Sequence, residues 1–590
     1  MTLALSSNGC SCDGGVGGGP GMDAGRGGDA GAVDATTPRP DAMGADSGSG
    51  DDAGPPLMDI VVIGPGAPAD AADRFGAPEG TDPSATPSIV YPLDGVLLPR
   101  NVYSPDVQWD GAGAAGDLYR VRFTGGPISL TAYVIHSGAA FRDDYVIDYP
   151  AWRSLLGVSA GARLSLTVDR WDSARDLVFR STPVVVRIAR GSIAGAVYYW
   201  ALGTFGGTEG RILRVRQGTD AAPVVENFMP TPPAGGGGQR CAACHGLSRD
   251  GNRLAVSFDD GSFGGVVDLT EDLSGATPPL VFRFSSSWFF AAFDPTGTRL
   301  FMTKPDRTSA LLDAATGAVL TPSTGALPSA THPAWSPDGN QLAFISSADE
   351  AWNPTTGDLS TISVTGADAF GAPAVLHTGS ALAGAPEGGD LDAYPSYSPD
   401  SRFIAFGHGT RTLLSAGGAS GALYVVPSGG GAAVRLDHAS VDDAWYPNFT
   451  PFATLSDDGS MVYWLLFYSP RDYGNSLAGT RGSGRRQIWV SAVSTEPGAG
   501  ADPSNVPYWL PGQDIAQENA SAYWAPVPCR PTGDACTTDD QCCGGHCDAS
   551  TGMCAPPVEC RARGETCATT ADCCEPGLAC AGGLCVPAPF

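Results

Sequence analysis

The fold of this 590-residue chain is decided by the stretch Trp335-Ser-Pro-Asp-Gly-Asn-Gln-Leu-Ala-Phe344. Four related segments repeat it: Leu247–Val256, Phe293–Met302, Tyr397–Phe406 and Leu455–Trp464. Each places a tight turn between two apolar runs, and in the Ser-Pro-Asp-Gly form of the turn Pro fixes one φ angle and Gly accepts a positive one. Strand-based repeats at intervals of about 40–60 residues are typical of propeller blades. The repeat therefore predicts an all-β fold with a β-propeller at its centre.

The two ends of the repeat region supply one further blade. Ile193–Ala201 and Arg211–Val215 are strand-like without an inner partner, whereas Ala520–Ala525 is an inner strand without a blade. Joined, they close a sixth blade and remove an exposed sheet edge; five and seven blades are the alternatives. Over residues 192–527 the pattern resembles TolB-type propellers, whose blades carry WD-like Ser-Pro-Asp-Gly turns. The resemblance implies an exported binding protein.

A cysteine pair followed by a histidine, Cys241-Ala-Ala-Cys244-His245, lies inside this propeller, and no other cysteine occurs between Cys12 and Cys529. The CxxCH spacing is the attachment signature of c-type haem, in which two thiols form thioethers and the histidine is the proximal iron ligand. The alternative is a local disulfide or half of a metal site, although no second CxxC is present to complete a zinc site. We predict covalent haem c at these residues.

Alignment on the repeat serine equates Cys244 with His332 and Tyr394, just before inner strands and near one mouth of the channel. A haem there lies on the propeller face, without the helix and methionine loop of cytochromes c. His332 is the predicted distal iron ligand, and a hydrogen-bonded channel histidine is the alternative. Weaker candidates are Met229, Met302 and His408.

Acidic residues also gather before predicted inner strands. Convergence of their carboxylates at one mouth predicts an oxygen-rich cation site, for calcium above all. Solvated turn residues of an acidic protein are the alternative. The residues are Asp390, Asp392, Asp442 and Asp443, with Glu518 before the last strand.

Residues 87–191 show short alternating segments separated by turns about every dozen positions. This spacing predicts a β-sandwich, with Trp109 and Trp152 as core anchors. The pattern resembles fibronectin type III or immunoglobulin-like modules, and that resemblance implies a spacer or adhesion domain. Residues 1–86 are mostly Gly, Ala, Asp and Pro, and we predict a signal remnant followed by a disordered acidic linker. Cys10 or Cys12 is a candidate for lipid attachment, with a local disulfide between them as the alternative.

The C-terminal tail is a second repeat, with six cysteines in residues 528–556 and six in residues 557–590. Each copy resembles the cystine-knot and dickkopf-like frameworks, which implies pairing of first with fourth, second with fifth and third with sixth cysteine; the spacing alone leaves fifteen pairings per copy open. Modules this small depend on disulfides because they cannot bury a sufficient core. The cysteines are Cys529, Cys536, Cys542, Cys543, Cys547 and Cys554, then Cys560, Cys567, Cys573, Cys574, Cys580 and Cys585.

Composition limits the function. A net charge of −28 argues against nucleic acid or an anionic membrane surface as partner. Twelve clustered cysteines predict an extracytoplasmic location: periplasm, outer membrane or cell surface. The chain lacks hydrolase and kinase motifs, which makes an enzyme with turnover the less favoured class. Two functions remain: a haem c propeller for electron transfer to a protein partner, or a non-redox binding scaffold with structural cysteines.

Overall fold

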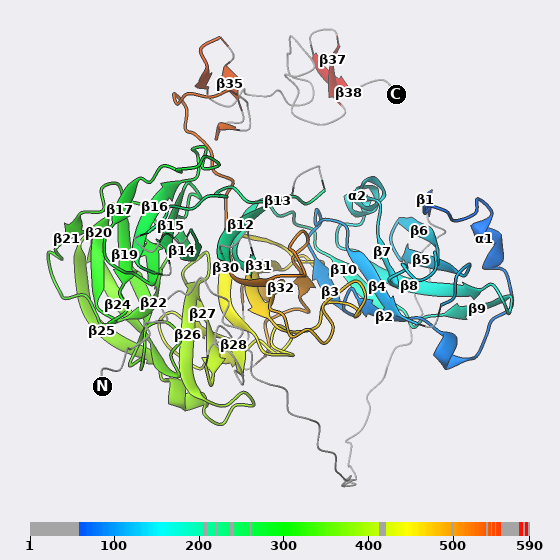
Figure 1. Ribbon diagram of the computed structural model, residues 1–590, viewed down its shortest axis with the longest axis horizontal. Helices are drawn as coiled ribbons and strands as arrows, with labels where there is room; N and C mark the ends of the chain where they lie inside the picture. Colours follow the sequence, from blue (N-terminus) through cyan, green and yellow to red (C-terminus); the bar gives the residue numbers. More distant parts are fainter. Residues whose placement is uncertain are drawn as a thin grey trace.

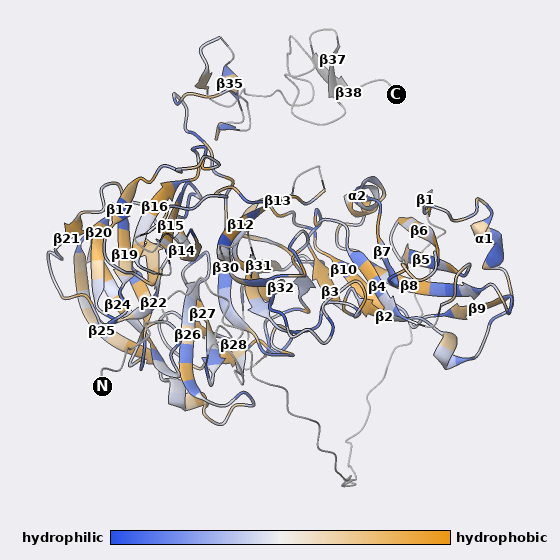
Figure 2. Cartoon of the chain, viewed as in Figure 1, coloured by the Kyte–Doolittle hydropathy of each residue, from blue (hydrophilic) through white to orange (hydrophobic). Residues whose placement is uncertain are grey.

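The computed structural model places a β-sandwich beside a β-propeller, with a small disulfide-rich module on the propeller (Figure 1). Hydrophobic residues, orange in Figure 2, gather along the strands of both large domains. None of the described helices is long and apolar enough to cross a membrane. The structure describes residues 58–555 except 112, 205–208, 219–221, 236–237, 239, 260, 412–419, 497–500, 538–540, 544–545 and 549, together with the backbone of 578–581 and 584–587.

The sandwich consists of a seven-stranded and a three-stranded sheet. Trp109 and Trp152 are fully buried in its core, as predicted. Two pairs are parallel, β1 with β6 and β10 with β3, so the domain departs from the antiparallel fibronectin-like pattern. In spatial order the large sheet contains β1 (Met58–Ile63), β6 (Ile128–Ile135), β5 (Leu118–Thr124), β8 (Arg163–Asp172), β10 (Val184–Ile188) and β3 (Val96–Leu98), with β9 (Leu177–Arg180) on β8; the small sheet contains β2 (Ser88–Tyr91), β4 (Asp106–Asp110) and β7 (Asp144–Val146).

The sandwich begins earlier than predicted, so the linker boundary at residue 86 is wrong. The apolar, β-branched run Met58–Ile63 pairs with β6, and α1 (Ala71–Arg74) and the 3-10 helix η1 (Pro83–Ala85) follow it. A helix that the alternation did not predict, α2 (Tyr149–Val158), covers the core. Its first turn is capped by the Asp148 carboxylate, which accepts from the Ala151 amide at 3.1 Å.

The propeller has six blades, as predicted. The last strand of the domain pairs with the first, and this clasp closes the ring of blades. From the innermost strand outward the blades are β14 (Ala242–Leu247), β15 (Arg253–Phe258), β16 (Phe263–Asp268) and β17 (Phe282–Phe284); β18 (Phe290–Phe293), β19 (Arg299–Thr303), β20 (Ser309–Asp313) and β21 (Val319–Leu320); β22 (Thr331–Trp335), β23 (Gln341–Ser346), β24 (Thr356–Gly366) and β25 (Ala369–His377); β26 (Asp390–Tyr397), β27 (Phe403–Gly409), β28 (Gly421–Pro427) and β29 (Val434–Arg435); β30 (Trp445–Leu455), β31 (Met461–Ser469), β32 (Gln487–Ser494) and β33 (Tyr508–Trp509); and β34 (Glu518–Ala525), β11 (Gly195–Thr204), β12 (Glu209–Gln217) and β13 (Val225–Glu226). The 3-10 helix η2 (Gly379–Leu382) lies between the third and fourth blades.

The repeated turn is held by its own side chains. In the third blade the Ser336 hydroxyl donates to the Asp338 carboxylate at 2.6 Å and accepts from the Gln341 amide at 2.9 Å. Gly339 adopts a φ of +76°, which an L side chain rarely does. Serine, aspartate and glycine therefore recur because each satisfies one requirement of the same turn.

Tryptophans lock neighbouring blades together at glycines. A Cβ atom added at Gly421 would lie 2.1 Å from the Trp445 ring, and one added at Gly264 would lie 2.0 Å from the Trp288 ring. Both tryptophans are fully buried. Because glycine has no side chain, these two positions leave the space in which the indole rings pack.

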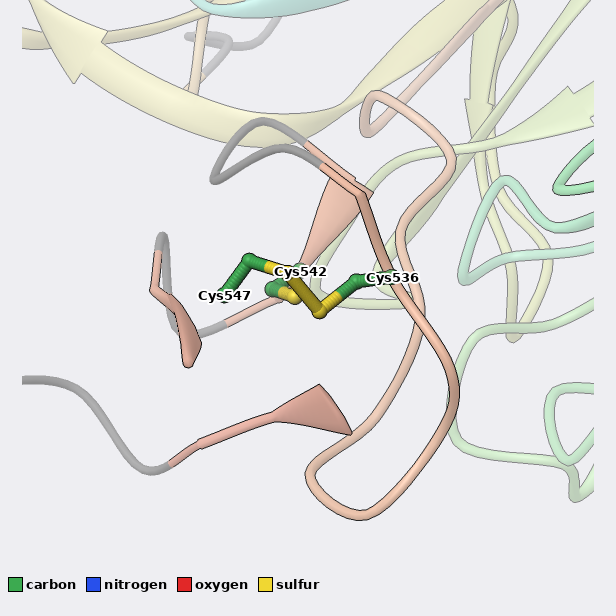
Figure 3. Close-up of side chains that lie close together, drawn as sticks. All are labelled: Cys536, Cys542 and Cys547. Atoms are coloured by element: carbon green, nitrogen blue, oxygen red, sulfur yellow. A yellow bond between two sulfur atoms is a disulfide. The ribbon is translucent and has the colours of Figure 1, made fainter. Parts of the chain in front are cut away.

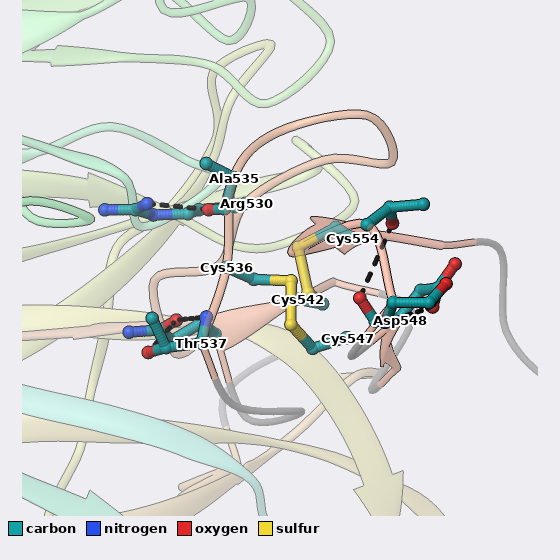
Figure 4. Close-up of a disulfide and its surroundings, with 11 residues drawn as sticks. Arg530, Ala535, Cys536, Thr537, Cys542, Cys547, Asp548 and Cys554 are labelled. Atoms are coloured by element: carbon teal, nitrogen blue, oxygen red, sulfur yellow. Dashed lines mark hydrogen bonds between the residues drawn. A yellow bond between two sulfur atoms is a disulfide. The ribbon is translucent and has the colours of Figure 1, made fainter.

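The first C-terminal module has the disulfide pairing that its resemblance implied. Bonds join Cys529 to Cys543, Cys536 to Cys547 and Cys542 to Cys554, as Figures 3 and 4 show in part. Arg530 fixes the module to the propeller, because its guanidinium donates to the Thr270 carbonyl at 2.9 Å. The predicted second module and Cys10 and Cys12 lie outside the described residues, except the backbone of β37 (Leu578–Ala581) and β38 (Leu584–Pro587).

Candidate functional site at the central channel

Six aromatic side chains close the central channel, one from the inner strand of each blade. Between successive members, five ring-to-ring contacts have centroid distances of 4.0 to 6.0 Å. We call this layer the channel ring; its members are His245, Phe290, His332, Tyr394, Tyr446 and Tyr523.

Local bulges in the inner strands form this layer. His332, Tyr394 and Tyr446 have φ angles of +49°, +53° and +59°, and strand pairing shifts register at each of them. A bulge re-aims a side chain that regular alternation would place elsewhere. In β14 the shift falls between Ala243 and His245, so Cys244 occupies the position that the repeat alignment equated with His332.

The two histidines of the channel ring are neutral and unsatisfied. His245 and His332 are each 3% exposed, and no ring nitrogen of either makes a hydrogen bond of good geometry within the described part of the chain. Burial lowers the pKa of both to about 3, opposed by a weak backbone hydrogen bond with Tyr198 for His245 and with Trp352 for His332, which involves one nitrogen of each ring. Buried polar atoms without partners are rare and costly. Each imidazole therefore retains a lone pair for a ligand.

The cysteines beside His245 are disulfide-bonded and buried. Cys241 is 1% and Cys244 7% exposed. The donor set fits haem c, since two sulfurs at the required spacing precede a neutral imidazole with free ring nitrogens. Thioether formation requires thiols, so this oxidised state must be reduced first.

The other predicted iron ligands lie elsewhere. Met229 and Met302 belong to blade cores. His332 contacts Phe290 and Tyr394, whereas His245 contacts Tyr523, so the two imidazoles occupy separate parts of the channel ring.

The Asp392 carboxylate joins two histidines that the sequence did not connect. It is fully buried between His377 and His408, whose Nδ1 atoms lie 2.7 and 2.9 Å from its oxygens. These residues come from β25, β26 and β27, so the cluster ties the third blade to the fourth. His408 is thereby engaged away from the channel ring.

The remaining acidic candidates do not converge. Asp390 and Asp442 are exposed, Asp443 accepts from the Gly421 amide at 3.0 Å, and Glu518 accepts from Arg486 at 2.8 Å. In the described part of the chain, the only three candidate ligand residues with close donor atoms are Cys536, Cys542 and Cys547, whose sulfurs are in disulfides. Calcium binding stays a prediction without a gathered ligand set.

Above the channel ring lies a pocket of about 170 Å³, which the sequence did not predict. Its lining includes His332 and Tyr394 from the ring and Arg249 from the first blade's repeat turn. No sequence signal marks the pocket as a unit, because its residues come from all six inner strands. We call it the channel pocket.

Comparisons with known proteins leave the family open. No family model matches the chain, and no curated protein matches it. Among solved structures, hydrazine synthase of Kuenenia stuttgartiensis matches at 13% identity over 45% of this chain and 75% of that chain. Its TM-score of 0.27 is too low to carry an argument about fold or function.

Proposed function

We propose that this protein is an exported haem c-binding β-propeller that transfers electrons to a protein partner. The observation that carries the proposal is His245, a buried neutral imidazole directly after Cys244, whose ring nitrogens make no hydrogen bond of good geometry to the described residues. A structural disulfide explains the two cysteines but gives no reason for an unsatisfied histidine in the next position.

Three residues have defined tasks in this proposal. Once reduced, Cys241 and Cys244 would hold a haem through thioethers, and His245 would hold its iron through a ring nitrogen. Burial keeps that nitrogen unprotonated down to a pH near its pKa of about 3. When bound, the haem supplies one-electron redox chemistry. His332 remains the proposed distal ligand.

The location of the protein follows in part from the first C-terminal module. Its three disulfides indicate an oxidising, extracytoplasmic environment. Within that setting, periplasmic or surface placement and a lipid anchor at Cys10 or Cys12 are part of the proposal. The TolB-like blades and the knot modules are the surfaces we propose for the protein partner, and the net charge of −28 disfavours nucleic acid.

A second candidate function is a non-redox binding scaffold. The observation that favours it is the oxidised, buried state of Cys241 and Cys244. In this alternative the oxidised cysteines stiffen the bulge of β14, and the function of the protein is to bind a partner through the propeller.

A pyridine haemochrome spectrum with intact-protein mass distinguishes the two. The full chain is produced in a host with a c-type maturation system, beside Cys241→Ser/Cys244→Ser and His245→Phe. Covalent haem predicts an added haem mass that the double serine variant loses and His245→Phe retains with an altered spectrum. A mass that shows only disulfides in the wild type rejects the redox function and leaves the scaffold.

A further inference from the structure

The channel pocket has walls suited to a flat apolar ring. Five of the six channel-ring residues line it, four of them with phenol or imidazole side chains, and rigid prolines surround them. Proline lacks an amide hydrogen, so these walls offer few backbone donors. The prolines are Pro295, Pro333, Pro337, Pro395, Pro399, Pro447 and Pro451.

The size of the pocket limits its ligand. An engineered apolar cavity of about 150 Å³ accepts one benzene molecule. At about 170 Å³, the channel pocket encloses the volume of a single aromatic ring with small substituents, and its open side faces solvent.

One cation lies in the pocket lining. Arg249 stands where three other repeat turns have Pro295, Pro337 and Pro399, so the first blade departs from the repeat at the pocket. In the part of the chain that the structure describes, no carboxylate forms an ion pair with it within 4.0 Å. Desolvation lowers its pKa, which an anionic ligand would reverse. Arginine presents a planar fork that matches a carboxylate.

A second polar group faces the pocket from its floor. His332 lines the pocket and is almost fully buried, and its ring nitrogens make no hydrogen bond of good geometry within the described chain. A neutral imidazole donates one hydrogen bond and accepts another. A hydroxyl or similar substituent on a ligand would satisfy it.

We propose that the channel pocket binds a small single-ring aromatic carboxylate. Its carboxylate pairs with Arg249, its ring lies among the tyrosines and prolines, and a polar substituent opposite the carboxylate meets His332. Cys241, Cys244 and His245 do not line the pocket, but His332, the proposed distal haem ligand, does, so the aromatic carboxylate and a haem held by His332 would exclude each other. The proposal is therefore tested on the haem-free chain.

Titration of the full chain with 4-hydroxybenzoate tests the proposal. Trp335 and Trp524 line the pocket, so tryptophan fluorescence reports occupancy, and calorimetry gives the stoichiometry. We expect one saturable site, with the neutral 4-hydroxybenzamide bound at least about tenfold more weakly.

Variants locate the site. Arg249→Gln should weaken 4-hydroxybenzoate binding by about tenfold or more, because a charge-assisted hydrogen bond is lost. The matched control, Arg485→Gln, removes an exposed arginine outside the pocket and should bind as wild type. Ala292→Leu fills the pocket and should abolish binding. No saturable binding, equal affinity for acid and amide, or an unchanged Arg249→Gln variant would each overturn the proposal.

Discussion

The Asp457 carboxylate of the fifth blade receives two hydrogen bonds from Arg187 of the sandwich, at 2.5 Å from Nη2 to Oδ1 and 2.9 Å from Nε to Oδ2. Asp457 occupies the place of proline in the repeated Ser-Pro-Asp-Gly turn. In the fifth copy of the repeat, the proline is therefore replaced by an aspartate that contacts the sandwich domain.

Asp457→Asn should destabilise the docked sandwich. The variant removes the charge of a buried group while leaving Arg187, whose side chain is 21% exposed, without its counterion. Partial exposure of Arg187 reduces the cost to about 1–3 kcal/mol, below that of a fully buried pair. Urea unfolding and limited proteolysis between the domains measure the loss. Asp458→Asn, at an exposed position of the same turn, is the control and should lie close to wild type.

The same pair predicts acid sensitivity. Burial opposes ionisation of Asp457, but hydrogen bonding and the charge of Arg187 outweigh it and lower the pKa of this carboxyl. A lowered folded-state pKa gives stability above the unfolded value, near 4, that is lost as the pH falls through the folded value. Wild type and Asp457→Asn should therefore converge in stability as the pH falls through the lowered folded-state pKa of Asp457; a gap that does not shrink on acidification contradicts the ion pair.

Asp106 predicts the opposite pH dependence. Desolvation, and then the charge of Asp144, raise the pKa of Asp106 to about 7. The folded state consequently binds this proton more tightly, so stability falls as the pH rises from about 4 to about 7 and the loss is complete above that. Asp106→Asn should abolish this decrease in stability with rising pH. At pH 8 its free energy of unfolding should exceed that of wild type by on the order of 1–3 kcal/mol. Melting temperatures measured from pH 4 to 8 test this, with Asp73→Asn at an exposed position as the control. The prediction is refuted if the melting temperatures of both variants depend on pH as that of wild type does.

Gly421→Val should disrupt the contact between the fourth and fifth blades. Its Cβ would overlap the buried Trp445 ring, and neither the indole nor the surrounding strands have room to move. Overpacking of this kind costs about 1–3 kcal/mol or more. Gly429→Val serves as the control, since a Cβ there meets nothing within 4 Å. Equal melting temperatures for the two variants would show that the Trp445 wedge is dispensable.

The sequence predicted features that repeat and missed those that depend on single contacts. Six blades and the closing clasp follow from periodic spacing, and the alignment of Cys244 with His332 matches the bulge of β14. The pairing in the first knot was implied by the resemblance to cystine-knot frameworks, since spacing alone leaves fifteen pairings open. The strand Met58–Ile63 was missed because a Gly- and Asp-rich stretch precedes it. Helix α2 was missed because its ten residues follow alternating segments.

The channel ring lay beyond sequence reasoning for a different reason. Its members are two histidines, one phenylalanine and three tyrosines, so no single residue type marks the position in all six blades. Three of them, His332, Tyr394 and Tyr446, are turned toward the ring by bulges, and a bulge has no sequence signature strong enough to find alone. Asp392 shows the same limit: its pairing with His377 and His408 is set by packing between two blades.

Two substitutions to phenylalanine within the channel ring should change stability in opposite directions. His332→Phe removes two buried nitrogens that make no hydrogen bond of good geometry to the described residues, while an aromatic ring can still contact Tyr394. Aromatic residues already adopt the same positive φ at Tyr394 and Tyr446. Tyr446→Phe instead removes a hydroxyl that is hydrogen-bonded to Tyr523 at 2.9 Å. We expect the first variant to gain and the second to lose about 1 kcal/mol in urea unfolding. A gain at His332 means that the native histidine is retained at a cost in stability, as a ligand-binding group would be; a loss means that its ring nitrogens already have partners in the folded protein.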